Sequence, residues 1–243
     1  MINCLIIDDE PLARTLLVEY LENFPEIKVV KECGDGFEGV KAIANFQPDF
    51  IFLDIQMPKI NGFEMLELVE NPPMVIFTTA FDEYAMKAFE SHAIDYLLKP
   101  FSKERFEKAI QKLLVQLKNN PIQVPVQTIF ESYNPANEKQ QRIVVKHGQD
   151  VRIIPLSEIT YLEAYGDYIK IHCKDGVFLK KQTMNYYENK LDPNQFIRVH
   201  RSFFVQSNTI HKIESADFVL LKSGEKVPVS KTGYARLKSS LGL

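Results

Sequence analysis

Three absences in the 243-residue sequence exclude whole classes of protein. It has only three cysteines, without the spacing of metal-ligating pairs, which is typical of buried thiols in a reducing cytoplasm. No apolar run approaches the ~18 residues of a membrane span, and the N-terminus lacks the basic-then-apolar layout of a signal peptide. Internal repeats and low-complexity tracts are also missing. We therefore expect a cytoplasmic protein without a membrane segment.

The composition is that of an ordinary folded chain, with 45% hydrophobic and 25% charged residues. At ~100–200 residues per domain, this length predicts one large or two small domains. The charge is uneven, because residues 1–139 carry 13 Lys and Arg against 22 Asp and Glu, whereas residues 140–243 carry 16 against 10. This asymmetry indicates an acidic module joined to one that tolerates a polyanion, although an excess of this size also arises by chance.

Residues 119–141 separate two regions of different sequence pattern. The segment contains three prolines, many amides and only one short apolar patch. Proline interrupts helices and favours extended backbone in the residue before it. The sequence therefore predicts a linker over 119–141, with one domain at 1–118 and another at 142–243.

The first region alternates short apolar runs with helical patterns. The runs at 4–7, 50–53 and 75–77 are apolar without alternation, which is typical of parallel strands covered on both faces. Between them apolar residues recur at helical spacing, and Asp35 with Glu38 predicts a helix start. Five strand–helix units result. The expected fold is α/β, a five-stranded doubly wound parallel sheet with helices on both faces.

The second region changes to the period of strands. Apolar and polar residues alternate over 169–174, and the Asp-Gly pair at 175–176 is typical of a tight hairpin. Helices are expected near residues 183–191 and 231–241, the second capped by Ser230. This region is therefore predicted to be mainly antiparallel β. We expect its aromatic residues Tyr161, Tyr165, Phe203 and Phe204 in the core.

Polar side chains follow the predicted strands of the first region. Asp8 and Asp9 end the first strand, Asp54 the third and Thr79 the fourth, and Lys99 follows the fifth. Because function gathers at the carboxyl ends of the strands in such sheets, we expect these side chains to lie together. Clustered carboxylates repel one another, and Mg²⁺ removes that cost through its oxygen ligands. The sequence therefore predicts a Mg²⁺ site with Asp54 as both ligand and candidate nucleophile.

A carboxylate nucleophile accepts a phosphoryl group as an acyl phosphate. A metal ion would neutralise some phosphoryl oxygens, and Lys99 and the hydroxyl of Thr79 could bind the others. For either residue alone the alternative is structural, with Lys99 merely pairing with Asp54 and Thr79 a plain strand-end hydroxyl. Five such positions at the ends of four strands favour the phosphoryl site.

Five motifs mark this region: Asp-Asp-Glu-Pro at 8–11, Leu-Asp-Ile-Gln-Met-Pro at 53–58, Asn-Gly at 61–62, Thr-Ala at 79–80, and Asp-Tyr-Leu-Leu-Lys-Pro-Phe at 95–101. Together they resemble the receiver domain of response regulators, over the whole of residues 1–118. The resemblance implies that Asp54 is phosphorylated by a partner sensor histidine kinase. It also implies that the peptide bond between Lys99 and Pro100 is cis.

The same resemblance assigns a role to each residue of the site. It implies that Asp9, Asp54 and the backbone carbonyl of Gln56 hold Mg²⁺, with Asp8 acting through water. Lys99 would contact the phosphoryl group.

The resemblance also implies a conformational switch. Thr79 and Tyr96 would form a switch pair, in which Thr79 moves toward the new phosphoryl oxygens and Tyr96 turns inward. The face formed by the fourth and fifth strand–helix units would then pair with a second copy, giving a homodimer.

The second region carries its own motifs, at 159–168, 196–203 and 227–230. Their order and spacing resemble the LytTR-type DNA-binding domain found behind receivers of the LytR/AlgR class, over residues 142–243. Members of that family present loops, not a recognition helix, to successive major grooves of double-stranded DNA.

By that likeness the DNA contacts lie near Asp167, at His200 and Arg201, and at Lys231. Lys231 follows the expected N-cap Ser230, where free helix amides and a lysine make a phosphate site. Arg201 is suited either to reading guanine or to gripping phosphate. The alternative is a solvated sheet face and a solvated lysine.

The sequence thus predicts a two-component transcription regulator, not an enzyme beyond its own Mg²⁺-dependent phosphorylation and slow dephosphorylation. One alternative is an aspartyl-phosphate hydrolase, which also uses a nucleophilic Asp and Mg²⁺. Such enzymes usually need a second acid two residues after the nucleophile, where this chain has Gln56. A second alternative is a receiver whose output module binds RNA or protein.

Overall fold

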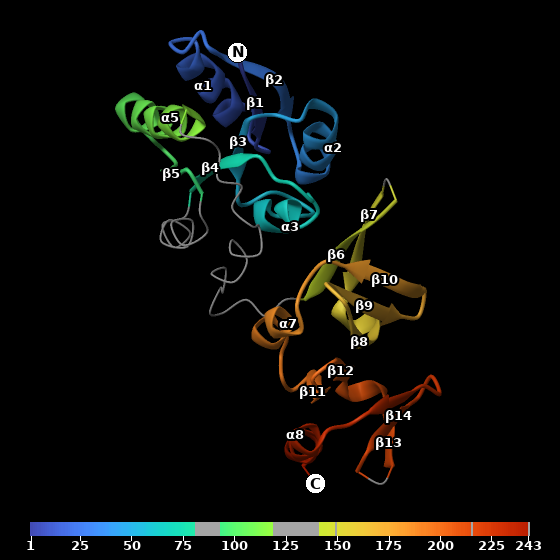
Figure 1. The fold of residues 1–243 in the computed structure, drawn as a ribbon. Coiled ribbons are helices and arrows are strands. Elements are labelled where there is room, and N and C mark those ends of the chain that lie inside the picture. The colour runs from blue at the N-terminus through green and yellow to red at the C-terminus, as the bar shows by residue number, and fades with distance from the viewer. Residues whose placement is uncertain (81–92, 119–140, 149, 215, 243) are drawn as a thin grey trace. The chain divides into compact units, whose positions relative to one another are not determined.

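The computed structural model in Figure 1 describes residues 1–80, 93–118, 141–148, 150–214 and 216–242. The chain divides into two compact units, residues 1–133 and 134–243. Apart from residue 141, the predicted linker over 119–141 lies outside the described residues, so its boundaries stay a prediction. Among the described helices, none combines the length and the apolar character needed to cross a bilayer.

Five parallel strands form the sheet of the first unit, in the order β2-β1-β3-β4-β5 (Figure 1). They are β1 (Ile2–Ile7), β2 (Ile27–Cys33), β3 (Phe50–Asp54), β4 (Met74–Thr79) and β5 (Asp95–Leu98). The strand order reverses direction between β1 and β3, and in such sheets ligands bind at this point, beyond the carboxyl ends of the strands. The predicted parallel sheet is confirmed.

Helices cover both faces of this sheet. They are α1 (Pro11–Leu21), α2 (Gly36–Phe46), α3 (Gly62–Leu66) and α5 (Lys103–Lys118). On one face Leu17 of α1 and Phe106 of α5 join the core, with Phe106 stacked 5.6 Å from the ring centre of Phe52. On the other face α2 packs closely enough that Gly39 approaches Ile7 of β1 and Met65 of α3. The helix expected after the fourth strand falls in residues 81–92, outside the described residues.

Local sequence signals explain where the helices of the first unit begin. The side chain of Asp35 accepts a hydrogen bond from the Glu38 amide at 2.9 Å, so the predicted cap of α2 is confirmed. Asn61 and Glu64 form a reciprocal capping box at the start of α3. At the start of α5 the hydroxyl of Ser102 accepts from the Arg105 amide at 3.3 Å, so three of the four described helices of this unit begin at a side-chain cap.

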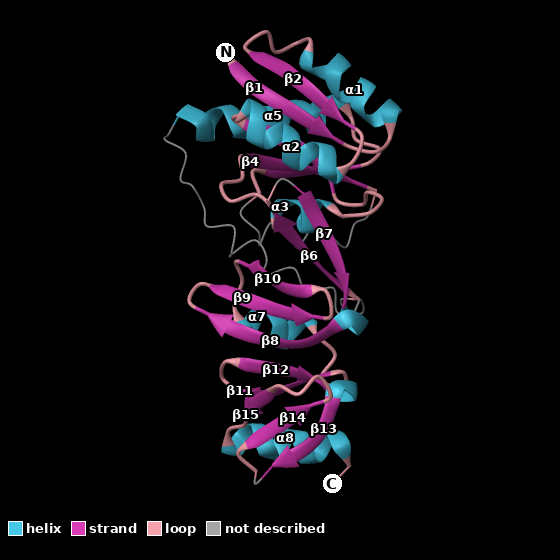
Figure 2. Ribbon diagram, turned by 90° about the vertical axis from the view of Figure 1, so that its right-hand side faces the viewer, coloured by secondary structure: helices cyan, strands magenta, loops and turns pink. Residues whose placement is uncertain are grey.

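The second unit is antiparallel β with two α-helices, as predicted (Figure 2). β6 (Arg142–His147) and β7 (Asp150–Pro155) form a hairpin, and α7 (Met184–Lys190) and α8 (Lys231–Leu241) are the helices. The main sheet has the order β10-β9-β8-β12-β11, built from β8 (Ile159–Tyr165), β9 (Tyr168–Cys173), β10 (Gly176–Lys180), β11 (Phe196–His200) and β12 (Phe203–Gln206). A smaller sheet contains β13 (Ile210–Glu214), β14 (Phe218–Leu221) and β15 (Lys226–Pro228).

One aromatic residue departs from the predicted core. Phe204 is buried, and Tyr161 and Phe203 pack against a core cluster while remaining partly exposed. Tyr165, however, is 55% exposed. It is the last residue of β8 and faces Tyr168 across the hairpin, and Lys170 Nζ lies 4.0 Å from its ring centre. The prediction that Tyr165 lies in the core is wrong.

Candidate functional site

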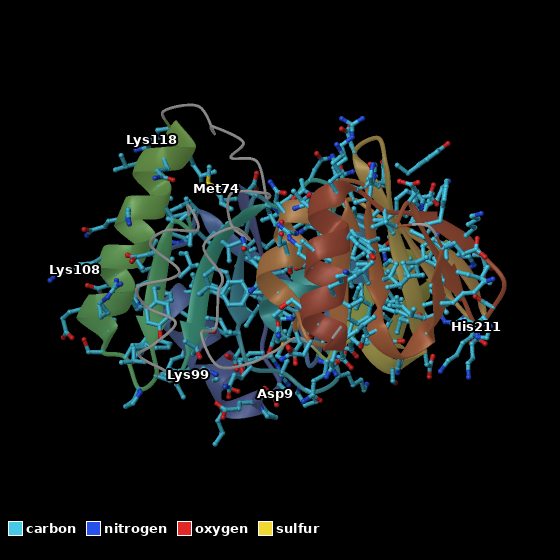
Figure 3. All side chains as sticks on the ribbon, turned by 90° about the horizontal axis from the view of Figure 1, so that it is seen from below. Asp9, Met74, Lys99, Lys108, Lys118 and His211 are labelled. Atoms are coloured by element: carbon cyan, nitrogen blue, oxygen red, sulfur yellow. The ribbon has the colours of Figure 1, made fainter. Side chains whose placement is uncertain are left out.

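The carboxyl ends of β1, β3, β4 and β5 meet at one edge of the first sheet. Asp8 and Asp9 follow β1, Asp54 ends β3, and Lys99 follows β5. Figure 3 shows Asp9 and Lys99 at this end of the unit, whereas Met74, the first residue of β4, lies toward the other end. The peptide bond between Lys99 and Pro100 is cis, as the resemblance to receiver domains implies. The strand ends thus bring the predicted polar side chains to one place.

Three carboxylates form a tight acidic cluster there. One oxygen each of Asp8, Asp9 and Asp54 lies within 4.8 Å of the others. Asp8 is fully buried and Asp54 is 4% exposed. Burial raises the pKa of Asp54 to about 6, and the nearby charge of Lys99 only partly opposes this effect. Burial also raises the pKa of Asp8. The cluster therefore carries an electrostatic cost when both buried groups are ionised.

Lys99 is the cation at the centre of this site. Its Nζ lies 2.8 Å from Asp8 Oδ2, 3.1 Å from Asp54 Oδ2 and 3.2 Å from Glu10 Oε2. Burial alone would lower the pKa of Lys99, but its contacts with Asp8 and Asp54 outweigh burial and raise it. Lys99 is therefore charged at neutral pH, and it contacts two of the three carboxylates of the acidic cluster.

Two hydroxyl-bearing side chains, Thr79 and Tyr96, lie on the strands beside the cluster. Thr79 is fully buried, and its hydroxyl has no hydrogen-bond partner within the described part of the chain. A buried, unpaired hydroxyl is costly, so a ligand oxygen at this position would satisfy it. Tyr96 on β5 is 5% exposed. The movement of Tyr96 that we expect on phosphorylation stays a prediction.

The loop after β3 holds Asp54 in place. The amide of Gln56 donates to Asp54 Oδ1 at 3.2 Å. A Cβ atom at Gly62 would lie 2.4 Å from the Asp54 carbonyl oxygen, so the loop can close on the strand end only because residue 62 has no side chain. Any larger residue at position 62 would push the acceptor strand and the loop apart.

In the second unit, the predicted contact residues converge at one end of the main sheet. Asp167 lies in the turn between β8 and β9, and Arg201 in the turn between β11 and β12. The amide of Ala164, near the end of β8, donates to the carbonyl of Ser202 in the second turn at 2.9 Å, so the two turns lie at the same end of the sheet. The start of α8 reaches the same end, because the Ser230 amide donates to the carbonyl of Val199 at 2.9 Å.

The side chains at this end are available to a ligand. Asp167, Arg201 and Lys231 are exposed, and their side chains form no hydrogen bond or ion pair with other described residues. Ser230 caps α8 by accepting from the Gly233 amide at 3.0 Å, so Lys231 stands in the first turn, as predicted. Nδ1 of His200 accepts from the Ser202 amide at 3.2 Å, which leaves Nε2 of the neutral ring to carry the proton.

Comparisons with known proteins identify both units. The response regulator receiver domain matches residues 4–111, and the LytTr DNA-binding domain matches residues 149–242. The transcriptional regulatory protein BtsR of Escherichia coli (strain K12) is 34% identical over 253 residues, which cover all of both chains. The chain belongs to the response regulators that carry a LytTR DNA-binding domain. It is a two-component response regulator, with a receiver domain followed by a DNA-binding output domain.

Solved structures resemble this response regulator one domain at a time. The LytTr DNA-binding domain of a methyl-accepting/DNA response regulator from Bacillus cereus is 27% identical, covers 43% of this chain and 99% of that chain, and gives a TM-score of 0.40. The response regulatory domain of protein mrkE from Klebsiella pneumoniae is 30% identical, covers 49% of this chain and 99% of that chain, and gives a TM-score of 0.45.

Sequence reasoning missed two residues at the acidic site of this response regulator. Glu10 is the third carboxylate on Lys99, and Arg14 donates from Nη1 to the carbonyl of Asp8 at 2.6 Å while its Nε lies 3.5 Å from Glu32. Arg14 lies one helical turn after Glu10, within reach of the Asp8 carbonyl. That spacing was visible in the sequence, but the partners of Arg14, which are Asp8 after β1 and Glu32 on β2, were not.

Proposed function

We propose that this response regulator accepts a phosphoryl group from a sensor histidine kinase at Asp54. The observation that carries the proposal is the convergence, at one edge of the sheet, of a buried carboxylate, a charged lysine and a hydroxyl without a hydrogen-bond partner among the described residues. Asp54 Oδ2 lies 3.1 Å from Lys99 Nζ, and Thr79 ends the neighbouring strand. A phosphoryl group on Asp54 would bring oxygens to both side chains.

The transfer forms one bond and breaks one. A carboxylate oxygen of Asp54 attacks phosphorus, and the P–N bond of the kinase's phosphohistidine breaks. The electron pair of that bond stays on the imidazole nitrogen, which then takes up a proton. Lys99 is charged at neutral pH and already contacts Asp54, so it can bind an oxygen of a phosphoryl group on Asp54. The hydroxyl of Thr79 donates to a second oxygen.

The acidic cluster fits a Mg²⁺ ion. Asp9, Asp54 and the carbonyl of Gln56 would hold it, with Asp8 acting through water, and a set of oxygen donors alone is what this ion prefers. When bound, Mg²⁺ neutralises the phosphoryl oxygens during transfer. The raised pKa of Asp54 supports this assignment, since a cation would offset the cost of ionising the cluster.

The product acyl phosphate serves as a signal and not as a turnover intermediate. Aspartyl-phosphate hydrolases usually have a second acid two residues after the nucleophile, and Gln56 offers an amide there. The protein is therefore not an enzyme beyond its own phosphorylation and slow dephosphorylation. Movement of Thr79 toward the phosphoryl group, with Tyr96 as its partner in the switch, changes the face of β4 and β5 and favours a homodimer.

The output domain binds double-stranded DNA through the two turns and the start of α8. Lys231 meets a phosphate with the first amides of the helix, and Arg201 reaches a base edge. Asp167 is a poor neighbour for phosphate but accepts a hydrogen bond from a cytosine amino group, and His200 offers a donor at Nε2. We place the protein in the cytoplasm, where DNA and the kinase's phosphohistidine are both accessible.

Phosphorylation by a small donor tests the acceptor directly. Incubation of the full chain with Mg²⁺ and acetyl phosphate should add one acid-labile phosphoryl group, counted by intact mass. Asp54→Asn should abolish the addition, and Asp9→Ala should slow it through weaker metal binding. Asp49→Asn is the matched control, because Asp49 is exposed and lies before β3, at its opposite end. Full incorporation into Asp54→Asn would disprove the assignment.

A further inference from the structure

The guanidinium group of Arg198, on β11, contacts three other parts of the output domain, which are α7, the turn that carries Arg201, and β12. Nη1 donates to Asn185 Oδ1 at 3.0 Å and also contacts the carboxylate of Glu188, both on α7. Nη2 donates to the backbone carbonyl of Arg201 at 3.2 Å. The group lies 5.6 Å from the ring centre of buried Phe204 on β12. Only 18% of the Arg198 side chain is exposed, and its guanidinium group contacts residues of its own domain.

The backbone beside Arg198 is irregular. The pairing of β11 with β12 shifts between Arg198 and His200, which leaves Val199 as an extra residue. The carbonyl of Val199 turns instead to α8, where it accepts from the amide and the hydroxyl of Ser230 at 2.9 and 3.2 Å. Bulges of this kind redirect the side chains that follow them. The turn that carries Arg201 therefore depends on contacts from outside the sheet.

Glu188 makes the Arg198 contact part of a larger network. Its second carboxylate oxygen lies 2.9 Å from Nη1 of Arg236 on α8. One carboxylate on α7 thus holds two guanidinium groups, one on β11 and one on α8. Because Glu188 is only partly exposed, its position limits where the Arg198 guanidinium can point.

We propose that Arg198 is a positioning residue for DNA recognition. By holding the carbonyl of Arg201, it fixes the direction in which the Arg201 side chain leaves the turn, and it does not itself touch DNA. The inference rests on the proposed contact between Arg201 and a base edge. The new element is that α7, for which no DNA contact is proposed, positions Arg201 through its contacts with Arg198.

The variant Arg198→Lys distinguishes a positioning role of Arg198 from a role of its positive charge. The ammonium group of Arg198→Lys keeps the positive charge and can pair with Glu188, but it cannot also span to the Arg201 carbonyl as a forked guanidinium does. The probe is the duplex that the wild-type full chain enriches from a random-sequence pool, and the reference is a scrambled duplex of equal composition. Arg198→Lys should weaken binding to the enriched duplex about tenfold and to the scrambled duplex by less than about twofold.

A double-mutant cycle tests whether Arg198 acts through Arg201. Arg201→Ala should also weaken binding to the enriched duplex about tenfold. In the Arg201→Ala background, Arg198→Lys should have no further effect, because the side chain that it positions is gone. A residue that merely supported the fold would weaken binding in both backgrounds. The control is Arg152→Gln, which breaks an ion pair with Asp175 at the opposite end of the main sheet and should change neither affinity.

The outcomes distinguish failure of this inference from failure of the proposed function. If Arg201→Ala leaves discrimination between the duplexes unchanged, the proposed base contact is wrong, and the role of Arg198 falls with it. If Arg201→Ala lowers discrimination but Arg198→Lys does not, only the positioning role is overturned. Equal loss on both duplexes, or full additivity in the cycle, also overturns that role. Thermal unfolding of each variant reports whether it is folded, and Arg236→Gln should keep discrimination because it touches Glu188 but not the turn.

Discussion

At the residue scale, the acidic site is organised around one cation and three carboxylates. Lys99 contacts Asp8, Glu10 and Asp54 at 2.8–3.2 Å, so a phosphoryl oxygen arriving at Asp54 must compete for an ammonium group that is already engaged. This competition favours a ligand with more negative charge than a carboxylate, which a phosphoryl group has at neutral pH. The arrangement thus suits an acceptor that remains inactive until it is phosphorylated.

Lys231 allows a test at the scale of one charge. Because it is exposed in the first turn of α8, we propose that it neutralises a single phosphate. Lys231→Ala should weaken binding to every duplex about equally and flatten the dependence of log affinity on log salt by about one unit. Titrations at several salt concentrations measure both effects, with Lys174→Ala as the control at the other end of the sheet. A loss confined to one sequence would mean that Lys231 reads a base.

At the element scale, α8 and β11 meet at their closest point beside the proposed DNA contacts. A Cβ atom at Gly233 would lie 1.7 Å from the carbonyl oxygen of Val199. Gly233→Ala must therefore push the helix start away from the bulge, which should destabilise the domain by about 1–3 kcal/mol. Urea unfolding measures the change, and Ser239→Ala on the exposed part of α8 is the control. An unchanged free energy of unfolding would show that the helix does not pack there in solution.

A second element contact, between β5 and α5, predicts a pH dependence. Arg105 grips both carboxylate oxygens of Asp95, at 3.0 and 2.8 Å. Burial would raise the pKa of Asp95, but the hydrogen bonds from Arg105 and from the Tyr96 amide outweigh it and hold the pKa below its usual value. Such a depressed pKa stabilises the fold above the unfolded-state pKa of about 4, and the stabilisation is lost as pH falls through the folded-state value.

Arg105→Gln should therefore lower the free energy of unfolding at pH 7 by roughly 1–3 kcal/mol. The difference from the wild-type protein should narrow as the pH falls below about 4, because Asp95 becomes protonated in both proteins. Urea unfolding across this pH range provides the measurement. In an Asp95→Asn background the effect of Arg105→Gln should lose its pH dependence, and a narrowing that persists there would assign it to another group.

The sequence predicts some of these features and not others, for physical reasons. Strand ends are marked locally by apolar runs followed by Asp54, Thr79 or Lys99, so the acidic site could be assembled from sequence and topology alone. The bulge at Val199 depends on the pairing of two strands, and no local pattern encodes it. The aromatic side chain of Tyr165 favours a core position in the sequence, but it ends β8, where its ring is 55% exposed and contacts the cation of Lys170.

At the scale of the whole molecule, the two domains divide chemistry from recognition. The receiver domain is the acidic half of the chain and the DNA-binding domain the basic half. A homodimer would place two DNA-binding domains on one duplex, and the second contact would then be effectively intramolecular. Coupling through dimerisation therefore requires no new contact between protein and DNA.

The central claim is that phosphorylation of Asp54 controls DNA binding. The most direct test measures the affinity of the full chain for a duplex with two enriched half-sites, with and without acetyl phosphate and Mg²⁺. Phosphorylation should raise the affinity of the wild-type protein by about tenfold or more and shift its mass in light scattering from monomer toward dimer. Asp54→Asn should show neither change, and Thr79→Ala should keep the phosphoryl group but lose most of both. Equal affinity of the phosphorylated and unphosphorylated wild-type protein for this duplex would contradict phosphorylation control of DNA binding.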